Sequence, residues 1–166
     1  MMEDPDVSAL THLDPRGGVH MVDVSAKSNT VRTAVATGRV LLGEEAFVLV
    51  KEQRIRKGDV LSTAQLAGIM GAKQTSRLIP LCHDVMLGGI DVELTLEENT
   101  QSVEVRAFAK TTGSTGVEME ALTAVSVAAL TIYDMCKSVS KGMRIHDIHL
   151  ITKTGGQSGN YRKDSL

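Results

Sequence analysis

The feature of the chain that most constrains its fold is a long helical segment, residues 115–137, whose charges lie only at its two ends. Thr115 and Glu118 have the Ser/Thr-x-x-Glu spacing of a capping box, which predicts that the helix begins there, and Gly142 is expected to end it. No residue from 121 to 133 is charged, and small residues are spread around the whole circumference. We therefore expect a helix that is buried on all sides, with a functional site at its charged ends.

The other predicted elements fall on both sides of this helix. Hydrophobic periodicity predicts a strand at 31–42, helices at 43–55 and 59–78, strands at 89–96 and 103–110, and a last strand at 143–153. Asp59 can cap the second helix, and Pro80 stops it. The order predicts an α+β fold, a ferredoxin-like β-α-β-β-α-β sandwich with one extra helix and an antiparallel sheet packed on helices. We expect one domain over 1–166, with 1–20 and 160–166 as flexible arms.

Composition excludes several classes of function. A net charge of −2 and an aromatic content of 2% offer neither a basic surface nor a stacking platform for nucleic acid, and no attraction to an anionic membrane. The uncharged run 121–133 is shorter than the roughly 20 residues that a membrane span needs. Cys82 and Cys136 form no C-x-x-C pair, which argues against a zinc or iron–sulfur site and for a reducing compartment. His146 and His149 are three apart on a predicted strand, so we expect them to face opposite sides and to share no metal.

Several segments together resemble one enzyme family. They are Thr-Gly-Val-Glu-Met-Glu-Ala-Leu-Thr-Ala at 115–124, Ala-Leu-Thr-Ile-Tyr-Asp-Met-Cys-Lys at 129–137, Met-Val-Asp-Val-Ser at 21–25, Lys-Gly-Asp at 57–59, Leu-Ile-Pro-Leu-Cys-His at 78–83, and Lys-Thr-Gly-Gly-Gln-Ser-Gly at 153–159. This pattern resembles the molybdenum cofactor biosynthesis protein C family, the cyclic pyranopterin monophosphate synthases, over nearly the whole chain.

The resemblance implies a reaction. Its substrate would be (8S)-3′,8-cyclo-7,8-dihydroguanosine 5′-triphosphate, and its products cyclic pyranopterin monophosphate and pyrophosphate. It implies no redox cofactor, and magnesium is expected only as a companion of the triphosphate. It also implies a cytoplasmic enzyme, with a mitochondrial location left open for a eukaryotic source. The alternative is a non-catalytic ferredoxin-like module that binds a nucleotide or pterin for regulation, which needs pocket residues but no acid/base pair.

Candidate catalytic residues lie at the second end of the long helix. Asp134 and Lys137 share a helix face at i, i+3, which in an arbitrary helix is an ion pair worth about 0.2–0.5 kcal/mol. The resemblance instead implies lysine/aspartate acid–base catalysis by this pair together with Lys57. A lysine beside an aspartate in a partly desolvated place can have its proton affinity tuned for such transfer.

Candidate substrate-binding residues lie at the first end of the helix and in three loops. Glu118 and Glu120 are about 200° apart on a regular helix, so we expect only one of them to face a ligand, and which one stays open. The glycine-rich stretch after Lys153 resembles a phosphate-cradling loop. The full candidate set is Leu81, Cys82, His83, Glu118, Met119, Glu120, Lys73, Lys153 and Arg32, with no metal ligands. Two departures from the family, Asp84 where proline is common and Gln74 where a basic residue is common, could alter the pocket.

The length of the helix itself predicts an oligomer. Glu118 and Lys137 are 19 residues apart, which is about 28 Å on a regular helix, too far for one small ligand to span. Either other loops complete each end, or one subunit supplies the carboxylate end and another the lysine end. We expect shared sites, which the hexamer that the resemblance implies, a trimer of dimers, would provide.

Overall fold

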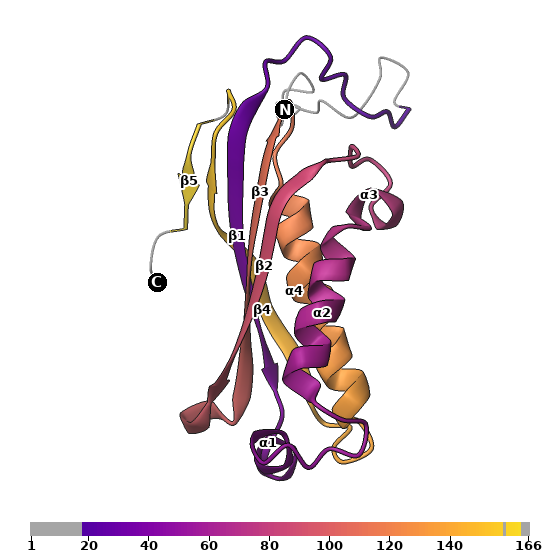
Figure 1. The fold of residues 1–166 in the computed structure, drawn as a ribbon, viewed down its shortest axis with the longest axis vertical. Helices are drawn as coiled ribbons and strands as arrows, with labels where there is room; N and C mark the ends of the chain where they lie inside the picture. The colour runs from indigo at the N-terminus through magenta and orange to yellow at the C-terminus, as the bar shows by residue number, and fades with distance from the viewer. Residues whose placement is uncertain (1–17, 158, 164–166) are drawn as a thin grey trace, which may run out of the picture.

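The computed structural model describes residues 18–157 and 159–163 as one antiparallel sheet with helices on one face (Figure 1). The strands lie in the order β2-β3-β1-β4-β5. The elements are β1 (Thr30–Leu41), α1 (Glu44–Lys51), α2 (Val60–Ala72), α3 (Thr75–Leu78), β2 (Leu87–Glu97), the 3-10 turn η2 (Glu98–Thr100), β3 (Ser102–Gly113), α4 (Glu118–Cys136), β4 (Arg144–Thr154) and β5 (Tyr161–Arg162). The predicted α+β class, with an antiparallel sheet packed on helices, is confirmed.

Strand β1 is the centre of the sheet, because it pairs with β3 on one side and with β4 on the other. Its alternate residues Ala34, Ala36 and Val40 are fully buried, whereas Val35, Arg39 and Leu41 are only partly buried. Small side chains on the buried face let α4 approach closely, and α4 packs across β1, β3 and β4.

Helices α2 and α4 run antiparallel along the sheet (Figure 1) and cross at glycines. A Cβ atom on Gly68 would lie 2.9 Å from the carbonyl oxygen of Ala124, and one on Gly71 would lie 2.7 Å from a methyl carbon of Val127. Asp59 caps α2 as predicted, since its carboxylate accepts a 3.1 Å hydrogen bond from the backbone N–H of Ser62. The antiparallel crossing places the start of α2 beside the end of α4.

The capping box predicted for α4 is wrong. The helix begins at Glu118, its N-cap residue Val117 makes no side-chain capping bond, and it ends at Cys136 rather than near Gly142. The Glu118 carboxylate is instead 3.0 Å from the Nζ atom of Lys153 on β4. A tertiary ion pair has therefore replaced the local capping interaction.

The predicted burial of α4 on all sides is also wrong for the single chain. One face, including Ala121, Ala124 and Ala128, lies in the core, but Leu130 is 60% exposed and Leu122 is only half-buried. By length and composition alone α4 could cross a membrane, but this core face packs against the sheet and α2. The exposed face leaves apolar surface available for contact with another chain.

The predicted helix 59–78 is two helices. After α2 ends, Lys73 and Gln74 turn the chain, and the short α3 ends before Pro80. This turn directs the following loop toward the first residues of α4.

Candidate active site

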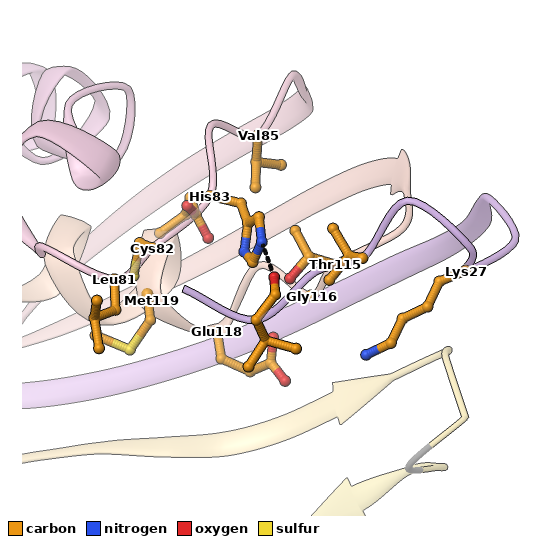
Figure 2. A pocket seen from close by; sticks show the side chains of 12 residues that line it. Lys27, Leu81, Cys82, His83, Val85, Thr115, Gly116, Glu118 and Met119 are labelled. Atoms are coloured by element: carbon orange, nitrogen blue, oxygen red, sulfur yellow. Dashed lines mark hydrogen bonds between the residues drawn. The ribbon is translucent and has the colours of Figure 1, made fainter. Parts of the chain in front are cut away.

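A cavity of about 480 Å³ lies at the start of α4, between the loop after α3 and the segment that precedes β1 (Figure 2). Six of the candidate substrate-binding residues line it together: Leu81, Cys82, His83, Glu118, Met119 and Glu120. The sequence analysis missed its other lining residues, which are Val22, Val24, Lys27, Val85, Thr115 and Gly116. Four of these residues lie inside segments that carry the family resemblance: Val22, Val24, Thr115 and Gly116. The resemblance could therefore have identified them as cavity residues.

The loop that carries Leu81, Cys82 and His83 is held at both ends. The N–H of Cys82 donates to the carbonyl of Ile79 at 3.1 Å, which closes a turn with Pro80 at its second position. Beyond His83, the carboxylate of Asp84 accepts a hydrogen bond from the Ser76 hydroxyl on α3. Asp84 is not among the residues that line the cavity, so this departure from the family pattern serves as a loop anchor.

Both acids at the start of α4 line the cavity, although we expected only one of them to face a ligand; which of them contacts the substrate stays a prediction. Glu118 is the first residue of the helix, and its ion pair with Lys153 sets the direction of its side chain. Glu120 is 4% exposed, and burial, with a smaller contribution from the charge of Glu118, raises the pKa of its carboxyl. The cavity thus holds one ion-paired carboxylate and one acid that keeps its proton more readily.

Cys82 is a half-buried free cysteine that lines the cavity. Burial, followed by the charge of Glu120, raises the pKa of this thiol. A raised pKa disfavours the reactive thiolate, so we assign Cys82 to the wall of the cavity rather than to a nucleophile. His83 makes a 2.7 Å hydrogen bond from Nε2 to the backbone carbonyl of Val22 (Figure 2).

The three candidate catalytic residues form one cluster at the other end of α4. Asp134 lies between the two lysines, with Oδ2 2.7 Å from Nζ of Lys57 and Oδ1 2.6 Å from Nζ of Lys137. Lys57 also donates to the backbone carbonyl of Asp134 at 2.8 Å. The hydrogen bonds from Lys137 and Lys57 lower the pKa of the Asp134 carboxyl to about 2, and the Asp134 carboxylate raises the pKa of Lys137.

This lysine cluster (Lys57, Asp134 and Lys137) is open to solvent in the single chain, since the Asp134 side chain is 56% exposed. We expected a partly desolvated pair, and the isolated chain does not provide one. Desolvation would have to come from a second molecule that covers the cluster.

The remaining candidate residues are placed differently. Arg32 is buried; its Nε donates to the carbonyl of Gly113 at 2.8 Å, and its guanidinium packs so closely on Gly156 that a Cβ there would be 3.0 Å from Cζ. With Lys27 it borders a second hollow of about 260 Å³. Lys73 is exposed where α2 ends and is not among the residues lining either space.

Among residues 18–157 and 159–163, no group of three or more His, Cys, Asp or Glu side chains lies close enough together to bind a metal ion. The expected opposite orientation of His146 and His149 is nevertheless wrong. His146 pairs with Arg39 and His149 pairs with Thr37, and these two residues share a face of β1. An irregularity at Asp147 (φ 54°) shifts the register between the two pairs, so both histidines lie on the same face of the sheet.

Comparison with known proteins shows the family of the chain. A family model described as the MoaC family matches residues 21–156. A cyclic pyranopterin monophosphate synthase of Salinibacter ruber is 66% identical over 99% of this chain and 95% of its own length, and one of Heliobacterium modesticaldum is 59% identical over 93% and 98%. A mitochondrial one of Arabidopsis thaliana is 53% identical over 95% of this chain and 58% of its own length. The chain belongs to the MoaC family.

Proposed function

We propose that the chain acts as a cyclic pyranopterin monophosphate synthase, a lyase of molybdenum cofactor biosynthesis. The substrate would be (8S)-3′,8-cyclo-7,8-dihydroguanosine 5′-triphosphate, with pyrophosphate as the second product. The names of the relatives support the activity. The observation that carries the proposal is the pair of charged groups at the two ends of α4: a cavity with two carboxyls, and a cluster of two lysines around one aspartate.

The lysine cluster suits the departure of pyrophosphate. Forming a cyclic monophosphate from a triphosphate requires a substrate hydroxyl to attack the α-phosphorus and to give up its proton to a base, while the bond between the α-phosphorus and the oxygen that bridges it to the β-phosphate breaks. Negative charge then grows on the leaving pyrophosphate, and fixed cations stabilise it. The Asp134 carboxylate favours the ammonium form of Lys137 and holds Lys57 beside it, so both lysines are placed as cations that can bind the leaving pyrophosphate.

The cavity suits the fused ring of the substrate. Met119 and Leu81 supply apolar contacts, and Glu118 can accept hydrogen bonds from ring N–H groups. Glu120, whose pKa is raised by burial, can donate one in its protonated form. A buried polar site of this kind discriminates strongly against a ligand that lacks the matching groups.

One chain cannot bring the two groups to one substrate, because the 19 residues of α4 put them about 28 Å apart. A twofold axis across the middle of α4 would place the lysine cluster of one chain against the cavity of another, and would do so twice. The exposed apolar side chains Leu66 and Met70 on α2 and Leu130 on α4 supply surface for such a contact. We propose a homohexamer, a trimer of such dimers, in which contact with the partner desolvates the lysine cluster.

The same proposal covers cofactor and location. Magnesium would arrive with the triphosphate as part of the substrate, and no redox cofactor takes part. The relative from Arabidopsis thaliana is named as a mitochondrial protein. For this chain we propose the cytoplasm.

A turnover assay tests the function. Purified protein is incubated with the cyclised triphosphate, and both pyrophosphate and the cyclic monophosphate are followed. Equal amounts of the two products are expected. Binding of the triphosphate without either product would instead establish the non-catalytic module.

A further inference from the structure

Residues 22–27, here called the strap, cross one side of the cavity in an extended path that ends in a turn (Figure 2). The side chains of Val22 and Val24 are half-buried and line the cavity, while Asp23 between them is exposed. The Asp23 carboxylate accepts hydrogen bonds from the N–H, at 2.8 Å, and the hydroxyl of Ser25. The N–H of Lys27 donates to the carbonyl of Val24 at 3.0 Å. The strap therefore has a defined local shape.

His83 ties this strap to the body of the protein. Its Nε2 atom is 2.7 Å from the carbonyl oxygen of Val22. A carbonyl oxygen only accepts hydrogen bonds, so Nε2 must carry a proton, both in the neutral ring and in the imidazolium. The bond consequently persists through protonation of the ring, and Nδ1 is the nitrogen that remains for any other partner.

The strap also places one cation that the sequence analysis did not select. Lys27 borders both the cavity and the neighbouring hollow that Arg32 lines. Figure 2 shows Lys27 at the end of the cavity away from Leu81 and Met119. An ammonium group there can reach a phosphate chain that leaves the cavity toward Arg32.

We propose that His83 is a positioning residue: its Nε2–H group fixes the strap as one wall of the cavity and so holds Lys27 beside the phosphates of the substrate. This inference rests on the proposed function for the identity of the ligand, but not for the role of the hydrogen bond. The competing assignment makes His83 a direct acid–base or substrate-contacting group.

Two conservative variants separate these roles. The amide nitrogen of His83→Gln lies as many bonds from the backbone as Nε2, so it can still donate to Val22. The amide of His83→Asn matches Nδ1 instead and falls short of Val22. A strap-positioning role predicts that the strap stays protected from exchange in His83→Gln and loses protection in His83→Asn, whereas a direct substrate contact or proton transfer by the ring predicts that neither variant changes the strap in the ligand-free chain.

The first measurement is hydrogen–deuterium exchange of the strap amides in the ligand-free full chain. Loss of one hydrogen bond should make exchange about three- to tenfold faster in His83→Asn, with His83→Gln close to wild type. Equal protection of the strap in wild type and His83→Asn would overturn the proposal. Because this measurement needs no substrate, it stands even if the turnover assay refutes the proposed function.

The second measurement is a double-mutant cycle on affinity for the triphosphate substrate. If His83 acts through the strap, Lys27→Met and His83→Asn should each weaken binding, and the double variant should be little weaker than either single one. Fully additive losses would mean that His83 does not act through Lys27, which contradicts the proposal.

Discussion

Gly116→Ala should impair turnover without removing any charged or polar group. Gly116 does not have a positive φ angle, so its backbone accepts alanine. The added Cβ would overlap Oε2 of Glu118, and it would lie 2.7 Å from Cδ and 2.9 Å from Oε1. Ordinary contact begins near 3.4 Å, so the carboxyl carbon must move by at least about 0.7 Å, away from its 3.0 Å pairing with Lys153.

The size of the effect follows from this displacement. A charge-assisted hydrogen bond to the substrate is worth about 1.5–3 kcal/mol, and misplacing a binding group by about 1 Å can cost up to 100-fold in rate. We expect kcat/KM to fall about 10- to 100-fold. Stability should change by less than about 1 kcal/mol, because the partly exposed Glu118–Lys153 pair contributes little and alanine reduces the entropy of the unfolded chain.

Gly113→Ala is the matched control, since its added Cβ would meet only the Thr111 side chain, at 3.7 Å or more. Steady-state pyrophosphate release and thermal unfolding of the two variants provide the comparison. If Gly116→Ala turned over as fast as Gly113→Ala, the position of the Glu118 carboxylate would have no part in the reaction.

Three further predictions concern the charged groups. Asp134→Asn and Lys137→Ala should abolish pyrophosphate release yet leave circular dichroism unchanged, because both side chains lie at the exposed end of α4 and outside the hydrophobic core; normal turnover by either would refute its catalytic role. Lys57→Ala and Lys153→Ala should each weaken triphosphate binding about 10- to 150-fold, as measured by calorimetry, for the loss of one charge-assisted contact. The raised pKa of Glu120 means that the folded state binds its proton more tightly than the unfolded state, so stability is lost as pH rises from about 4.5 through the folded pKa. Glu120→Gln should therefore reduce the pH dependence of the unfolding temperature over that range. The same pH dependence in this variant and in the wild type would show that Glu120 is not its cause.

Local patterns predicted the elements that depend on local interactions. The strands follow from alternation of apolar residues, and α2 begins at Asp59 because that carboxylate satisfies a backbone N–H three residues away. The start of α4 could not be predicted in this way. Its first glutamate is engaged by Lys153, which lies 35 residues further along the chain and comes close only in the folded sheet.

The site shows the same division. Motifs selected six residues around the cavity, but the strap was missed because Val22 and Val24 lie in a segment without helix or strand periodicity. Likewise, the irregularity at Asp147 puts His146 and His149 on the same face, although simple alternation predicts opposite faces. Contacts between distant segments and register shifts are set by tertiary packing, which a single sequence does not display.

Mixed oligomers test most directly whether each site joins the cavity of one chain to the lysine cluster of another. Lys137→Ala and Glu120→Ala chains, each inactive alone, are co-expressed at equal levels, and mixed assemblies are verified by mass spectrometry. In a mixed dimer one shared site carries both defects and the other carries neither, so random pairing should restore about a quarter of wild-type pyrophosphate release. No recovery in verified mixed oligomers would contradict shared sites and would mean that each chain completes its own.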